Sequence, residues 1–344
     1  MMLAILFLLF LVCLWGLRFS KTNDDYLPKE TTNAIKGIFA VIVLCSHLGW
    51  SLSLSDSFLD KTYLHIITYI GQTMVAPFFF ISGYGVFYSF RHKPDYKTGF
   101  LAKRLFKVLF QFDLTVLLFI VVQALLSIYW PIKNYIWCWI GWESVGNYNW
   151  FVFVILSLYL ITWIGMLLDK GNGHALIGCT ILLSIVLWLV LRFVADKETW
   201  WVDTIATFPL GMVYCAAKKQ TDRLLLNGRK AVWYIAFFFL LALFMEWHHL
   251  HGVDVFGICS CLFSLLLVVT MMKIRIGNPI LSFLGRNAFS IFILQGLPML
   301  VLSYYGINCR PSLYILLTII FTLLLAEGST RLSDHFYQKW FSAR

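Results

Sequence analysis

The sequence predicts an all-α protein, a polytopic transmembrane helical bundle of about eleven helices, with roughly ten in a core and one extra at the N-terminus. Of its residues, 60% are hydrophobic and only 13% are charged, whereas soluble domains carry about 25% charged residues. Apolar runs of membrane-spanning length recur along the chain, and basic residues concentrate in alternate loops between them. The formal charge of +10 therefore reports on membrane topology and not on nucleic-acid binding.

The predicted spans cover most of the chain. They lie at residues 2–17, 35–54, 67–90, 106–130, 150–168, 175–194, 201–217, 231–248, 253–272, 280–304 and 312–332. The first run has no basic residue before it and no small-residue cleavage site behind it, so we expect an uncleaved helix and not a signal peptide. The expected division is an extra helix with a cytoplasmic loop over 1–33, a membrane domain over 34–335 and a cytoplasmic tail over 336–344.

The distribution of Lys and Arg predicts which side of the membrane each loop faces. Basic clusters occur at 18–29, 91–104, 218–230 and 273–275, and in the tail from residue 331. The alternate loops hold only Lys61, Lys133, Arg192, Lys197 and Arg310, among several acidic residues. Because cytoplasmic loops are enriched in Lys and Arg, we expect a multi-pass protein of the cell (plasma or inner) membrane with its N-terminus outside and its C-terminus in the cytoplasm.

Two ionisable residues, Lys36 and His47, lie in the second apolar run. Their spacing puts them on one helix face, roughly 16 Å apart along the axis. Ionisable groups at that depth are costly and usually functional, so His47 is a candidate general base shielded from bulk water. The alternative is a core histidine that hydrogen-bonds a neighbouring carbonyl or hydroxyl group.

The next helix and the basic segment after it supply further candidates. Ser82 lies in a stripe with Gly85 and Ser89, which is typical of close helix packing; Ser82 or Tyr84 could also line a pocket beside His47. The cations Lys103, Arg104 and Lys107, together with Lys36, could bind the phosphates of an anionic cofactor. The alternative is that these cations act as stop-transfer charges next to a membrane span and contact anionic lipids.

The helix that starts near residue 150 brings an amide and an indole ring to the outer side. Asn149 and Trp150 could meet the hydroxyl groups and ring of a sugar, although interfacial anchoring accounts for Trp150 as well. The eight cysteines show no spacing typical of metal ligands or of a redox pair, so no metal site is expected.

Taken together, these motifs resemble the acyltransferase-3 family of integral-membrane acyltransferases, which acylate cell-surface glycans. The family has a cation followed eleven residues later by a histidine, here Lys36 and His47. Further similar segments are Phe-Phe-Ile-Ser-Gly-Tyr at 79–84, Phe-Leu-Ala-Lys-Arg at 100–104, Asn-Trp-Phe at 149–151 with Tyr159, Phe-Pro-Leu-Gly at 208–211 and Leu-Gly-Arg-Asn-Ala-Phe-Ser-Ile-Phe at 284–292. The chain departs from the family where Lys36 replaces the usual arginine and where Gln295 stands in place of a common second histidine.

The resemblance implies an O-acyltransferase domain over 34–335 that moves an acyl group, most simply acetyl, from cytoplasmic acetyl-CoA to a hydroxyl of a polysaccharide or its lipid-linked precursor. His47 would act as the base, and Ser82, Tyr84 or Asn149 would stabilise the oxyanion. Acetyl-CoA would be a co-substrate, with no tightly bound cofactor and no nucleic-acid partner. A membrane transporter or flippase for a glycan or small anion, and a non-catalytic regulator on the same scaffold, are the alternatives.

Overall fold

The computed structural model describes residues 2–20, 23, 25–52, 54, 56–251 and 256–341. Part of the predicted tail 336–344 and the start of the predicted span at 253 lie outside these residues. The long helices are α1 (Met2–Leu14), α2 (Lys29–Ser51), α3 (Phe58–Ile70), α4 (Ala76–His92), α5 (Lys107–Leu125), α7 (Trp150–Leu168), α8 (His174–Leu189), α9 (Thr207–Leu225), α10 (Lys230–His251), α11 (Phe256–Met271) and α15 (Pro311–Phe341). Shorter elements are α6 (Ile132–Trp137), α12 (Pro279–Arg286), α13 (Ala288–Leu294), α14 (Gly296–Tyr304), the 3-10 turn η1 (Gly71–Met74) and the π-helical turns η2 (Leu101–Phe106) and η4 (Val190–Val194).

The predicted all-α membrane fold is confirmed. In the described part of the chain, seven helices are long and apolar enough to cross a membrane, and a bent pair made of α12 and α13–α14 makes up to eight. Helices α1 and α11 are apolar but shorter, so a total of eleven crossings stays a prediction, as do the domain limits at residues 34 and 335. The only strands among the described residues, β1 (Arg18–Phe19) and β2 (Ile274–Arg275), pair antiparallel and join two connecting segments.

Two predicted spans differ in shape from the structure. The helix expected at 67–90 belongs to a longer helical run, Phe58–His92, because α3 continues through η1 into α4. The helix expected at 280–304 is bent by 56° between α12 and α13. The bend falls at Asn287, whose side chain donates to the carbonyl of Phe283 and to Glu327; Asn side chains that bond locally in this way compete with a regular helix.

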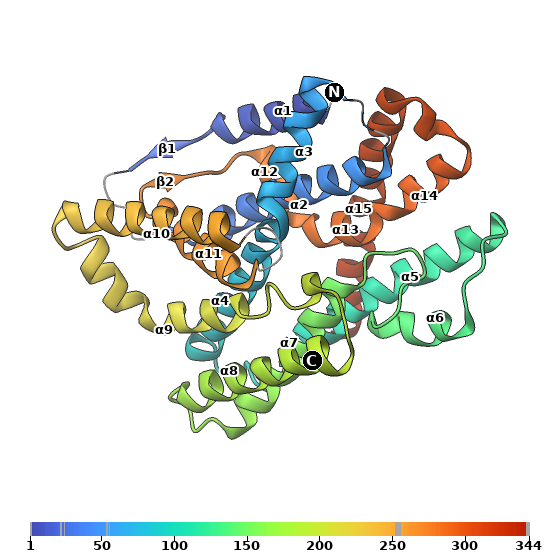
Figure 1. The fold of residues 1–344 in the computed structure, drawn as a ribbon. Coiled ribbons are helices and arrows are strands. Elements are labelled where there is room, and N and C mark those ends of the chain that lie inside the picture. The colour runs from blue at the N-terminus through green and yellow to red at the C-terminus, as the bar shows by residue number, and fades with distance from the viewer. Residues whose placement is uncertain are drawn as a thin grey trace.

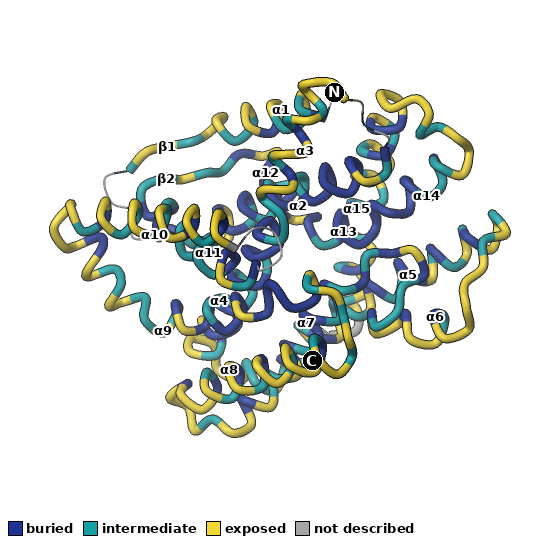
Figure 2. The backbone as a smooth tube through the Cα atoms, in the orientation of Figure 1, coloured by how far each residue is buried: buried dark blue, intermediate teal, exposed yellow. Residues whose placement is uncertain are grey.

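Helix α2 lies in the middle of the bundle (Figure 1) and is the most buried of the long spans, whereas α8 and α10 expose most of their surface (Figure 2). Helix α2 packs closely on α12 because Gly37 of α2 and Gly285 of α12 have no side chains. A Cβ atom on Gly285 would lie 1.8 Å from the Asn33 carbonyl oxygen, and one on Gly37 would lie 2.6 Å from that of Leu281. These contacts fix α12 against the N-terminal half of α2.

Helices α4 and α9 are held together in the same way. A Cβ atom on Gly83 would lie 2.0 Å from the Phe208 carbonyl oxygen, and one on Gly211 would lie 2.1 Å from that of Phe80. The α4 glycine at this crossing is Gly83. It lies next to the stripe of Ser82, Gly85 and Ser89, whose spacing is typical of close helix packing. The stripe itself faces a cavity, described below.

We therefore predict that Gly83→Ala or Gly211→Ala destabilises the protein, because the added methyl group meets a backbone carbonyl that cannot move aside. Overpacking of this kind costs about 1–3 kcal/mol, and the thermal midpoint in detergent should fall, as measured by the fraction of monomer that survives heating. The matched control is Gly178→Ala on α8, where a Cβ atom meets nothing within 4 Å and helix propensity favours alanine. Equal stability of the two groups of variants would contradict the prediction.

Candidate functional site

A cavity of about 1050 Å³ lies along α2. Its walls come from α4, α7, α12 and α13, with residues 25–28 at one end. The residues that line it include Lys29, Thr32, Lys36, Ala40 and Val43 of α2, Phe78, Ile81, Ser82, Tyr84, Gly85, Tyr88 and Ser89 of α4, Phe151, Ile155 and Tyr159 of α7, and Gly285, Arg286, Ala288, Phe289 and Phe292 of α12 and α13. Arg104 of η2, Lys93 and Lys218 complete its charged rim. The face of α2 predicted from the spacing of Lys36 and His47 also carries Ala40 and Val43, and it meets the cavity at Lys36, Ala40 and Val43.

The cavity is cationic. Six Lys and Arg side chains line it against one acid, Asp25: Lys29, Lys36, Lys93, Arg104, Lys218 and Arg286. Two of the six are neutralised, since Lys218 pairs with Asp222 at 2.6 Å and Arg286 pairs with Glu327 at 3.2 Å. In the described ranges the other four form no salt bridge. This excess of positive charge suits a ligand with several negative groups.

Arg104 and Lys36 reach the cavity from two different elements, and their positive charges repel each other. Arg104 donates from Nε to the Tyr96 hydroxyl at 3.2 Å. Next to it, the hydroxyl groups of Ser82 and Tyr159 are 2.7 Å apart and hydrogen-bonded. Because both cations face one space, an anion bound between them would relieve their repulsion.

Only one of the three cations predicted in the basic segment lies in the cavity. Lys107 forms an ion pair with Asp334 at 2.7 Å, and Lys103 is exposed on the outside of η2. Neither is among the residues that line the cavity. Lys103 points outward because neighbouring residues on a helix point about 100° apart and Arg104 points inward, whereas Lys107 is held outside the cavity by its ion pair with Asp334.

His47 lies just beyond the cavity and is buried. Its ring stacks face to face on Tyr148, with centroids 3.7 Å apart and planes 6° apart. The rings of Trp50 and Phe292 follow at 5.6 Å and 6.4 Å. Its Nδ1 atom finds no hydrogen-bond partner among the described residues. The role of His47 as a base stays a prediction, as does its alternative, a core histidine that hydrogen-bonds a neighbouring group. The Gln295 side chain is the polar neighbour of His47.

The loop that carries Tyr148 is tied down by buried amides. Gln123 of α5 donates to the Val145 carbonyl at 2.6 Å and accepts from the Trp130 indole at 3.1 Å. Asn134 of α6 donates to the Ser144 carbonyl at 2.6 Å. The amide oxygen of Asn147 accepts from the backbone N–H of Val145 at 3.0 Å. These bonds set where the Tyr148 ring lies, and nothing in the local sequence around Tyr148 indicated its contact with His47.

Two residues proposed for sugar contact have other partners in the structure. The Asn149 amide donates to the Gly141 carbonyl at 2.8 Å and closes the same loop. Trp150 packs edge-on against Phe151, with centroids 6.1 Å apart. Neither is among the cavity-lining residues, whereas Ser82, Tyr84, Lys36 and Arg104 all are.

We predict that Gln123→Leu loosens this loop, because the variant loses both amide bonds and leaves the Val145 carbonyl and the Trp130 indole unpaired. The free energy of local opening should fall by about 1–3 kcal/mol, so amide hydrogen exchange over residues 142–148 should become faster. Exchange in α8 serves as the internal control and should not change. If residues 142–148 exchange as slowly as in the wild type, other contacts hold the loop and the prediction is wrong.

Comparison with known proteins places the chain in a family. The acyltransferase-3 family model, an acyltransferase domain, matches residues 31–326. That range contains Lys36, His47 and every cavity wall except the end formed by residues 25–29. No curated protein and no solved structure matches the chain. Since the match covers most of the chain, and the fold is a multi-pass bundle of apolar helices, this protein belongs to the acyltransferase-3 family and is a membrane acyltransferase.

Proposed function

We propose that this protein transfers an acetyl group from cytoplasmic acetyl-CoA to a hydroxyl of a cell-surface polysaccharide or of its lipid-linked precursor. The observation that carries the proposal is the cationic cavity beside His47. Four of its cations have no ion-pair partner among the described residues, and the cavity extends along the face of α2 that leads from Lys36 towards His47. The protein would lie in the plasma or inner membrane, with the basic loops and the C-terminus in the cytoplasm and the N-terminus outside.

The charge and shape of the cavity favour acyl-CoA as the donor. CoA carries several phosphate charges, and Arg and Lys side chains bind phosphates by charge-assisted hydrogen bonds. Lys36 and Arg104 would meet those phosphates, with Lys29 and Lys93 nearby. Further along α2 the lining residues are the small Ala40 and Val43, which leave room for the thin pantetheine arm. A volume of about 1050 Å³ is large enough for a cofactor-sized ligand.

His47 would act as the general base. The acceptor hydroxyl oxygen attacks the thioester carbonyl carbon while the imidazole takes the hydroxyl proton. The new C–O bond forms, the C–S bond breaks, and CoA leaves as a thiolate that picks up a proton. Positioned proton transfer of this kind contributes about 10²–10⁴-fold, and burial against Tyr148 shields the imidazole from bulk water.

Ser82 and Tyr84 are proposed to hydrogen-bond the donor on the cavity side of Phe292, beside Arg104. Ser82 is held by Tyr159, and both Ser82 and Tyr84 line the cavity. Asn149 is left out of this contact because its amide already donates to Gly141.

We predict that His47→Ala lowers acetyl transfer by about 10²–10⁴-fold, because the hydroxyl then lacks its base. The measurement is incorporation of labelled acetyl from acetyl-CoA into glycan in membranes that contain the variant. His65→Ala is the matched control, since His65 is an exposed histidine on α3. Near-wild-type transfer by a folded His47→Ala protein would rule out this mechanism.

We further predict that Lys36→Gln and Arg104→Gln each raise the KM for acetyl-CoA about tenfold or more, because each removes a charged contact worth about 1.5–3 kcal/mol. The KM for the acceptor should stay close to that of the wild type. Lys170→Gln removes an exposed positive charge that does not line the cavity and is the control. If the KM for acetyl-CoA is unchanged in both variants, the donor does not bind in this cavity and the prediction is wrong.

A further inference from the structure

Phe292 occupies the boundary between the cavity and His47. It lines the cavity and is 8% exposed. Its ring centroid lies 6.4 Å from that of His47, 6.3 Å from that of Tyr148 and 5.2 Å from that of Phe151. Of the described residues that line the cavity, Phe292 is the one whose ring contacts the imidazole.

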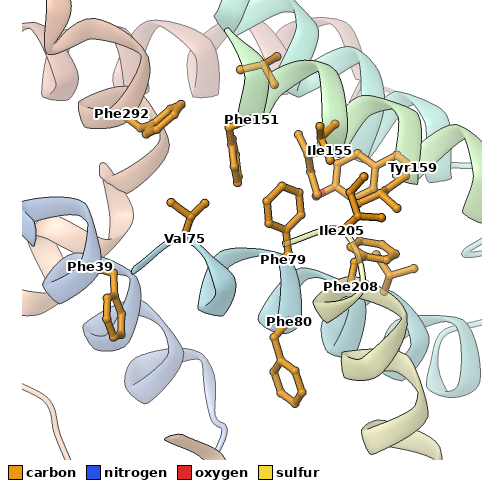
Figure 3. Packing of buried hydrophobic residues seen from close by; sticks show 14 of the residues in the cluster. Phe39, Val75, Phe79, Phe80, Phe151, Ile155, Tyr159, Ile205, Phe208 and Phe292 are labelled. Carbon is orange, nitrogen blue, oxygen red and sulfur yellow. The ribbon is translucent and has the colours of Figure 1, made fainter. Parts of the chain in front are cut away.

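The cavity wall around Phe292 is aromatic and closely packed. Phe151 lines the cavity too, and its ring contacts Phe78 at 6.2 Å and Phe79 at 4.7 Å. Figure 3 shows Phe292 and Phe151 projecting from α13 and α7 into the space between these helices, with Phe79 below Phe151. His47 is not among the residues that line the cavity. Phe292 therefore lies between the cavity and the imidazole, beside the route that an acyl group would follow from the one to the other.

The backbone just before Phe292 is held by hydrogen bonds to two other helices, α15 and α5. At the bend before α13, the Asn287 amide donates to Glu327 of α15 at 2.7 Å. Ser290 is hydrogen-bonded to Thr330 of α15 and accepts from Gln111 of α5, at 2.6 Å and 2.5 Å. Because these contacts position α13, the space available beside His47 depends on the size of the side chain at position 292.

We propose that Phe292 is a specificity-determining residue that limits the transferred acyl group to a short chain. The proposal rests on the proposed function. Acetyl is a small acyl group, so it takes up little of the space beside the Phe292 ring. Each further methylene has to fit into the same aromatic wall, where one methylene changes discrimination by about 10–200-fold in apolar enzyme pockets.

The test compares Phe292→Ala with the wild type on acetyl-CoA, butyryl-CoA and hexanoyl-CoA. We expect the ratio of kcat/KM for butyryl-CoA to that for acetyl-CoA to rise about tenfold or more in Phe292→Ala. Phe292→Leu keeps most of the apolar volume and should raise the same ratio by a smaller factor. It provides the measurement if the alanine variant does not fold.

Phe244→Ala is the matched control. Phe244 on α10 is 9% exposed and its ring lies 6.0 Å from that of another histidine, His248, but it does not line the cavity. Its butyryl-to-acetyl ratio should equal that of the wild type. If the Phe292 variants lose activity equally on all three donors, the ring has only a packing role and this inference is wrong, while the proposed function stands. If the wild type transfers an acyl group from none of the acyl-CoA donors, the proposed function is wrong, and so is this inference.

Discussion

Positive charge inside a membrane protein needs water, hydrogen bonds or a counter-ion, because the hydrocarbon around it offers none of these. This constraint organises the protein. Lys36 on the central helix α2 and Arg104 on the π-helical turn η2 face one cavity and repel each other. Arg104 has the Tyr96 hydroxyl as a partner, while the acids Asp222 and Glu327 are engaged by Lys218 and Arg286. A cavity with such a lining favours an anionic ligand, and its position beside His47 connects that ligand to the chemistry of an acyltransferase.

Close helix packing builds the walls of this cavity. The contact of Gly285 with Asn33 brings α12 onto α2, and the contacts of Gly83 and Gly211 bring α4 and α9 together. Small residues permit such close approach because they add no side-chain bulk between the helix backbones. Inside a bilayer the hydrophobic effect does not drive helices together, so close packing and hydrogen bonds hold the bundle. The neighbours of these glycines, Ser82 and Arg286, are consequently turned into the cavity.

The charged cavity and the buried imidazole are separate environments joined at one wall. Tyr148 covers one face of the His47 ring and Phe292 stands on the side of the cavity. A general base works best where bulk water does not compete for the proton. In the proposed function, this division would let one part of the protein bind a highly charged donor while another keeps the reacting groups away from bulk water.

The membrane fold class, the family resemblance and the shared helix face of Lys36 and His47 could be predicted from the sequence, because hydrophobic run length, short motifs and helix periodicity are local properties. The sequence also identified Ser82, Tyr84 and Arg104 as candidates, and all three line the cavity. Three contacts became visible only in the folded protein. Lys107 pairs with Asp334, Asn149 closes a loop, and Tyr148 and Phe292 flank His47. Those contacts join segments far apart along the chain, and their geometry depends on a bend at Asn287 and on glycine contacts between helices, which no local pattern reports.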